Sequence, residues 1–109
     1  MEKGPSTSAE YWTSEYSEVK HFDKHGEEMG YRNDIQGYSQ AAKNFANNNG
    51  RHIKSFKAQN GSTYKYNPKT NEFGIISKNG KIVTYFEPER GEEYFNDQFE
   101  NFGDYWINY

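Results

Sequence analysis

Aromatic side chains supply most of the large apolar residues in this 109-residue chain, and they limit how it can fold. The sequence contains ten Tyr, eight Phe and two Trp, but only six Ile, two Val and no Leu. Its mean hydropathy of −1.26 is typical of disordered segments. Each buried ring, however, removes a large apolar area from water and offsets the entropy lost on ordering. We therefore expect one compact domain with a largely aromatic core.

Charge is distributed unevenly along the chain, although the formal net charge is only −3. Residues 1–50 have a balance of −3, residues 51–81 a balance of +6, and residues 82–109 a balance of −6. The basic stretch predicts a surface for a phosphate-bearing partner, or else an ordinary solvated strand face rich in lysine. The chain has no cysteine, which excludes disulfides and thiolate zinc sites.

The spacing of the apolar residues changes along the chain from helical to alternating, which indicates an α+β fold. One helix is predicted over residues 14–29, and a second is capped by Asn33 or Asp34 and closed by residues 47–50. Four strands in an antiparallel meander follow, then a short helix over residues 92–102. The first strand holds Ile53 and Phe56, and the others cover residues 62–67, 72–77 and 81–86. We expect the helices to pack on one face of this four-stranded sheet.

The N-terminal residues differ in composition from the rest of the chain. Residues 1–9 are small and polar, and we assign residues 1–13 to a linker or an expression-derived extension. Residues 14–109 then form a single domain. No apolar run is long enough to span a membrane and no signal-peptide pattern is present, so we expect a soluble domain without membrane contact.

The segment from His21 to Gly26 carries the first candidate chemical groups. His21 and His25 are four residues apart, so on a helix they lie on one face, with Lys24 one step around. An imidazole can accept and return a proton near neutral pH, and a lysine can hold a phosphate. The alternative is a pair of ordinary surface histidines. A zinc site is disfavoured because Phe22 stands where a metalloprotease helix needs Glu, and no third ligand has a recognisable spacing.

The last predicted strand carries a second set of candidate groups. By simple alternation Ile82, Thr84 and Phe86 share one face, and Val83 and Tyr85 share the other. If the first face meets the first helix, the Thr84 hydroxyl can donate to a phosphate oxygen while Phe86 supports a base or an imidazole. The alternative is ordinary sheet packing by both residues.

Lysines and tyrosines are interleaved along the predicted sheet, a combination that suits unpaired nucleotides. Such lysines could stabilise the extra negative charge of a phosphate under attack, and the tyrosines could stack on bases. Strand tyrosines are also common core residues, so this pattern alone is weakly specific. The candidate substrate-binding residues are Lys54, Lys57, Lys65, Tyr66 and Lys81.

The segment from His21 to Pro88 resembles the toxin domains of the colicin D-like ribonucleases, which occur in colicins, contact-dependent inhibition proteins and LXG-type secreted toxins. The resemblance covers somewhat over half of the chain. Its most specific part is an asparagine-proline turn followed by a lysine-asparagine-glycine turn. The matching pieces are Lys24-His25-Gly26 with Gly30 downstream, the helix 38–45, the strand and turn 64–74, and residues 77–86.

This resemblance implies the small helix-plus-sheet fold of the wider barnase, EndoU, colicin and RelE grouping. It also implies RNA cleavage, often of tRNA, without a metal or another cofactor. By position, His25 matches the family's catalytic histidine and Lys24 its neighbouring lysine. Thr84 matches a hydroxyl residue in the last strand, and Phe86 an aromatic residue that is often tryptophan.

The expected function is therefore a bacterial toxin ribonuclease, secreted by the producing cell and active in the cytoplasm of a target cell. It is expected to act as a monomer and to be inhibited by a cognate immunity protein that covers the basic face. Two alternatives remain open. One is a non-catalytic module that binds nucleic acid or protein through the same surface, and the other is a metal-dependent DNase toxin.

Overall fold

The computed structural model describes residues 11–109, which form an α+β domain with eight helices and strands. Two N-terminal helices, α1 (Glu15–His25) and α2 (Ile35–Ala46), precede the sheet. Helix α3 (Glu92–Phe102) follows the meander, as predicted from the sequence. The strands are β1 (Lys54–Ala58), β2 (Thr63–Asn67), β3 (Glu72–Ile76), β4 (Ile82–Phe86) and β5 (Gly103–Asn108). The predicted fold class, with its two N-terminal helices and antiparallel meander, is confirmed.

Side-chain caps fix where both N-terminal helices begin. The Ser14 hydroxyl accepts a hydrogen bond from Ser17 N at 3.0 Å, and the Asp34 carboxylate accepts one from Gly37 N at 2.9 Å. Helix α1 also has acidic residues in its first turn and Lys24 and His25 in its last turn, which suits the helix dipole. It is shorter than predicted, because it ends at His25 rather than at residue 29.

The sheet has five strands in the order β4-β3-β2-β1-β5, and all neighbouring pairs are antiparallel. Strand β5 extends the four predicted strands by pairing with β1, so that Phe56 lies opposite Trp106. It begins directly after α3, without a turn signal in the sequence that would separate the two elements. The sequence pattern alone therefore does not predict this fifth strand.

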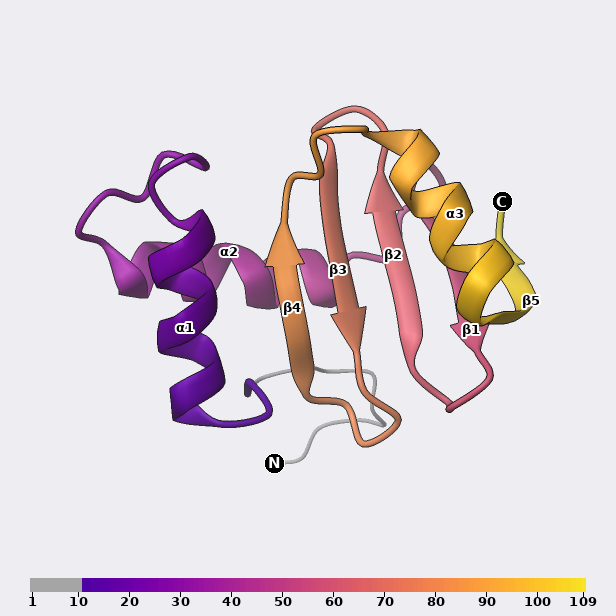
Figure 1. Ribbon diagram of the computed structural model, residues 1–109, viewed down its shortest axis with the longest axis horizontal. Coiled ribbons are helices and arrows are strands. Elements are labelled where there is room, and N and C mark those ends of the chain that lie inside the picture. Colours follow the sequence, from indigo (N-terminus) through magenta and orange to yellow (C-terminus); the bar gives the residue numbers. More distant parts are fainter. Residues whose placement is uncertain (1–10) are drawn as a thin grey trace.

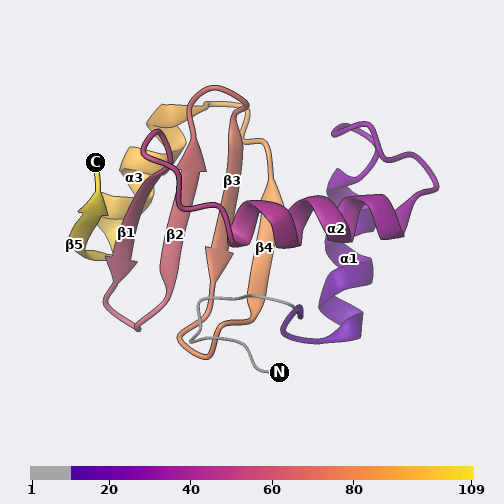
Figure 2. The same cartoon turned by 180° about the vertical axis from the view of Figure 1, so that it is seen from behind.

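The helices cover both faces of the sheet rather than one (Figure 1, Figure 2). Helix α2 packs on one face, where Phe45 lies against Gly74 of β3. Helix α3 packs on the opposite face, where the buried Phe95 stacks on Tyr66. Because β-strand side chains alternate between faces, the two faces carry two separate aromatic clusters. The expectation that the helices share one face is wrong. Helix α3 buries its own Phe95, and the apolar surface on which Phe95 packs lies on the face opposite α2.

A β-bulge in the β3–β4 pairing changes which β4 side chains share a face. Ile75 pairs with Thr84, but the next residue, Ile76, pairs with Ile82, so Val83 is an extra residue in β4. Ile82 therefore joins Tyr85 in the cluster under α2. Thr84 and Phe86 do share the α3 face, as alternation predicted, but the placement of Ile82 with them is wrong.

The folded domain begins earlier than residue 14. Trp12 is 6% exposed, forms a parallel bridge with Ile82 and packs in the cluster under α2. Thr13 N donates to Ile82 O at 2.9 Å, and Ile82 N donates to Tyr11 O at 2.8 Å. Residues 11–13 thus cover the outer edge of β4 and belong to the domain. The rest of the predicted linker, residues 1–10, lies outside the described residues.

Candidate functional site

The last residue of α1 meets the last residue of β4. The His25 imidazole stacks on the Phe86 ring, with 4.7 Å between ring centroids and 16° between planes. Helix α1 lies beside β4 and is fixed by aromatic contacts, among them Phe22 against Tyr38 of α2 at 5.7 Å. The Tyr38 hydroxyl in turn donates to the backbone oxygen of Tyr85, next to Phe86. Residues distant in sequence are in this way brought to one point.

The surroundings of His25 favour a neutral imidazole. Its Nδ1 lies 3.3 Å from the Glu28 carboxylate, and only 13% of its side chain is exposed. Burial lowers the pKa of His25 below 6.5, and this effect outweighs the opposing influence of Glu28. Within residues 11–109, no hydrogen bond occupies Nε2. At pH 7 the ring can therefore accept a proton at Nε2 from a ligand.

An open hollow of about 440 Å³ lies beside this ring, and its charged groups are mostly acidic. Lys24 contributes one cation, and Glu28, Glu87 and Glu89 contribute three carboxylates. Burial raises the pKa of Glu87, and the carboxylates of Glu72 and Glu28 raise it further. The hollow thus combines a histidine that favours its neutral form with a carboxyl group shifted toward its protonated form.

The other two residues predicted for catalysis lie at different distances from this hollow. His21 stacks on His25 with 6.2 Å between centroids, but its Nδ1 lies 2.8 Å from Ser17 O and its ring packs on Trp12. Thr84 is half-buried opposite Ile75, two residues before Phe86 on the same face. It does not line the hollow at His25.

The five residues predicted to bind substrate are spread over the sheet instead of surrounding His25. Lys54 forms an ion pair with Glu92 of α3. Tyr66 is 4% exposed beneath α3, and its hydroxyl donates to Asn71 at 2.7 Å, so its ring offers no free face to a base. Lys81 lies over the Tyr11 ring at 5.0 Å. The remaining two, Lys57 and Lys65, lie together on the α2 face.

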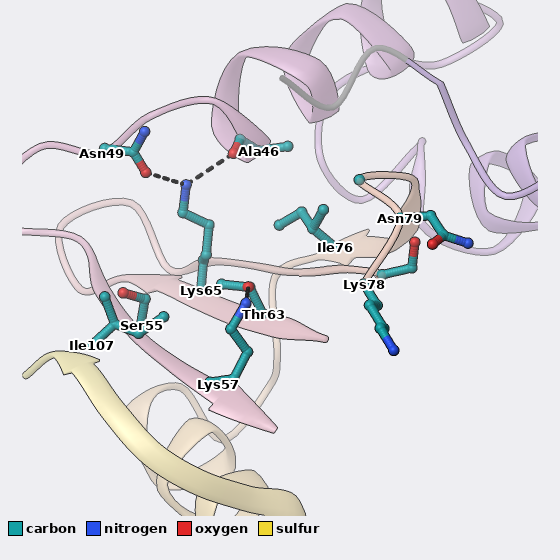
Figure 3. Close-up of a pocket in the computed structure, with 12 residues that line it drawn as sticks. Ala46, Asn49, Ser55, Lys57, Thr63, Lys65, Ile76, Lys78, Asn79 and Ile107 are labelled. Atoms are coloured by element: carbon teal, nitrogen blue, oxygen red, sulfur yellow. Dashed lines mark hydrogen bonds between the residues drawn. The ribbon is translucent and has the colours of Figure 1, made fainter. Parts of the chain in front are cut away.

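That second location is a groove of about 490 Å³ between the end of α2, strands β1 and β2, and the turn after β3 (Figure 3). Three lysines line it: Lys57, Lys65 and Lys78. Lys65 is 4% exposed, and its Nζ donates to Ala46 O at 2.9 Å and to Asn49 Oδ1 at 3.0 Å. We call this surface the basic groove. It lies across the sheet from α3, on the face that carries α2.

Lys65 is expected to make stability depend on pH. Burial lowers its pKa from 10.5 to about 8, so between pH 8 and pH 10 the unfolded chain holds more protons at this residue than the folded chain. The free energy of unfolding should therefore rise by roughly 2 kcal/mol from pH 7 to pH 10 through Lys65 alone. Urea denaturation of wild type and Lys65→Met at each pH measures this contribution as the difference between the two curves. Parallel curves would show that Lys65 titrates normally.

Sequence reasoning missed Glu87 and Lys78, which line the two sites. Glu87 directly follows Phe86 but lies beyond the end of β4, where carboxylates are common and carry no spacing signal. Lys78 stands in the lysine-asparagine-glycine turn, which the sequence marks as a chain reversal and as part of the family resemblance but not as a binding site. Only their positions in the sequence could have indicated them: Glu87 follows Phe86, and Lys78 lies in the turn before β4.

Within residues 11–109, no group of three or more His, Cys, Asp or Glu side chains is arranged to hold a metal ion. Over the same residues, no helix has the length and apolar character needed to cross a membrane.

The fold is shared with a known enzyme, although no family model and no curated protein matches this sequence. A ribonuclease from Escherichia coli, solved in complex with its inhibitor protein, superposes with a TM-score of 0.54. The superposition covers 72% of this chain and 95% of that chain, with 19% identical residues. At this identity the likeness establishes the fold alone. The α+β domain described here therefore has a fold that a bacterial ribonuclease also adopts, and the narrower colicin D-like assignment stays a prediction.

Proposed function

We propose that this domain is a ribonuclease that cleaves RNA without a metal ion. The observation that carries the proposal is the placement of His25: a largely buried, neutral imidazole, held by Phe86 and Glu28 at the edge of an open hollow. A base near its working pH is what activation of a ribose hydroxyl requires. The fold shared with a ribonuclease supports the same reaction class.

In the proposed reaction His25 Nε2 takes the proton of the ribose 2'-hydroxyl. The 2'-oxygen then forms a bond to the adjacent phosphorus, and the bond from phosphorus to the 5'-oxygen of the next nucleotide breaks. Glu87, which lines the same hollow, is the candidate to give a proton to that leaving oxygen, because burial raises its pKa in the direction that this role requires. Lys24 stabilises the additional negative charge on the phosphate. The products are a 2',3'-cyclic phosphate and a 5'-hydroxyl.

The remaining predicted residues take supporting roles in this scheme. Phe86 orients the imidazole by stacking, and the His21 ring also stacks on it, with 6.2 Å between centroids. Thr84 is the predicted hydroxyl donor to the phosphate, and it would act if the substrate reaches two residues along β4 from Phe86. The three carboxylates at the hollow repel phosphate, so affinity for RNA has to come largely from another surface.

The biological setting of the proposal follows from the resemblance to colicin D-like toxins. We propose a secreted toxin that acts on RNA, with tRNA as the expected substrate, in the cytoplasm of a target bacterium. The producing cell would then need an immunity protein that binds the domain. The E. coli ribonuclease of the same fold was solved with an inhibitor protein, which supports this type of partner.

Product analysis tests the proposed reaction. Purified tRNA and total RNA are incubated with the protein in excess chelator, and the new ends are identified by their reactivity toward phosphatase and polynucleotide kinase. Ends carrying 2',3'-cyclic phosphate and 5'-hydroxyl groups are expected. Activity that disappears in chelator, or cleavage of DNA, would favour the metal-dependent DNase instead. Tight binding of RNA without any cleavage would favour the non-catalytic binding module, which the basic groove, separate from His25, also supports.

A further inference from the structure

We propose that the basic groove on the α2 face binds the phosphodiester backbone of single-stranded RNA, at a distance from the groups that cut it. The groove combines three lysines with neutral polar side chains (Figure 3), and among residues 11–109 no carboxylate pairs with any of those lysines. It would supply the affinity that the acidic hollow at His25 lacks. The inference rests on the proposed function only in choosing RNA over DNA.

Within the described part of the chain, no carboxylate neutralises the charge of the groove. Lys57 Nζ donates to the Thr63 hydroxyl at 3.1 Å, and both acceptors of Lys65 are neutral oxygens. None of the described residues that line the groove is an Asp or Glu. By contrast, Lys54 on the opposite face is paired with Glu92. The positive charge in the groove is therefore free to attract an anion.

Two features hold the lysines in place. The Lys65 ammonium is fixed by two hydrogen bonds at the end of α2, and a pKa of about 8 leaves it mostly protonated at pH 7. The side chain of Lys78 runs along Gly61 at the β1–β2 turn, where an added Cβ would come within 3.0 Å of Lys78 Cδ. A lysine held in position loses less entropy on binding a phosphate than one that moves freely.

The size of the groove and an aromatic neighbour favour a nucleic-acid strand over a single small anion. A volume of about 490 Å³ exceeds what one phosphate fills. Tyr105 of β5 pairs with Lys57 of β1, so their side chains share a face, and Tyr105 is 54% exposed. A cationic groove beside an exposed aromatic ring is the combination on which unpaired bases stack. Serine, threonine and asparagine side chains in the groove add donors for phosphate oxygens.

The two faces of the sheet would then have different roles, with RNA cleaved at His25 and bound in the basic groove. His25 and Phe86 lie where α1 meets the end of β4, and the groove lies under the end of α2 near the other edge. A substrate that reaches both sites must pass around the domain or fold over it. RNA with a single-stranded region several nucleotides from the cut can do so.

The test uses an oligonucleotide that cannot be cleaved, so that binding is measured apart from catalysis. A fluorescent 2'-O-methyl RNA of about ten nucleotides is titrated with the full chain, and anisotropy gives Kd at several salt concentrations. The variant Lys57→Gln/Lys78→Gln removes two charges from the groove. The matched control Lys20→Gln/Lys69→Gln removes two exposed lysines elsewhere. Circular dichroism and urea denaturation confirm that both variants are folded.

The groove variant is expected to raise Kd about tenfold at low salt and to reduce the slope of log K against log salt by about 1.4. The control should change Kd by less than about twofold. Equal losses in both variants would overturn the proposal, because they would indicate general charge attraction. A polyglutamate peptide that displaces the RNA at lower concentration than unlabelled RNA does would also overturn it, in favour of an acidic protein partner.

Further arms separate this inference from the proposed ribonuclease. A 2'-deoxy strand that binds as well as the 2'-O-methyl strand supports recognition of the phosphodiester backbone. His25→Ala should bind the probe as wild type does. If wild type cleaves no RNA but its binding of the probe still depends on Lys57 and Lys78, the groove inference is supported and the proposed activity is wrong. If wild type cleaves RNA but the groove variant binds the probe with an unchanged Kd, only the groove inference is wrong.

Discussion

Replacing His25 with alanine should reduce the rate of RNA cleavage by about 10²- to 10⁴-fold, the range that a positioned general base contributes. The substitution removes the group that is proposed to accept the 2'-hydroxyl proton. It also removes a stack on Phe86 at the surface of the domain, which contributes about 1 kcal/mol to stability. The variant should therefore fold and lose its activity.

The measurement is the initial rate of tRNA cleavage under single-turnover conditions, together with urea denaturation of each variant. His52→Ala is the matched control, because His52 is an exposed histidine in the turn before β1. It should cleave RNA at the wild-type rate. If His25→Ala and wild type cut equally fast, His25 has no part in the reaction and the proposed mechanism is wrong.

Replacing Phe56 with alanine should lower the free energy of unfolding by about 3–5 kcal/mol. Phe56 is 0% exposed at the centre of the cluster under α3. Its ring lies 5.3 Å from Phe95, 5.1 Å from Phe99 and 5.5 Å from Trp106, measured between centroids. Truncation leaves a cavity among rigid rings that cannot collapse to fill it. For a domain of ordinary stability, about 5–15 kcal/mol, this is a large loss.

Urea denaturation followed by tryptophan fluorescence checks this expectation. Phe102→Ala is the control, because Phe102 lies in α3, the helix that covers this cluster, and stacks on Tyr64 but is 48% exposed. Its loss should cost about 1 kcal/mol or less. Similar midpoints for the two variants would mean that Phe56 is not the centre of this core.

The parts of the fold that were predictable depend on local signals. The side chains of Ser14 and Asp34 accept backbone hydrogen bonds and so fix the starts of α1 and α2. Asn60-Gly61 makes the β1–β2 turn, with Gly61 at a φ of +91°. Such features involve residues a few positions apart. Strand β5 and the position of α3 depend instead on partners about fifty residues away, such as Phe56 for Trp106. No periodicity within residues 92–109 could indicate which face of the sheet they would cover.

The candidate site follows the same rule. Lys24 and His25 are neighbours in sequence, and the structure brings Phe86 to them. The lysines of the sheet were expected near His25, but they lie elsewhere. Alternation shows which residues of a strand share a face, but it does not show which helix covers that face. The acidic character of the hollow was equally hidden, since Glu28, Glu87 and Glu89 come from two separate segments.

Helix α1 carries His25, yet none of its residues is fully buried. Its attachment depends on a few ring contacts, chiefly Phe22 on Tyr38 and His25 on Phe86. A segment held in this way detaches at a lower free energy than the central strands. Gentle warming should consequently detach α1 and abolish the proposed RNA cleavage while the sheet is still intact, and an inhibitor that held this one helix away from β4 would have the same effect.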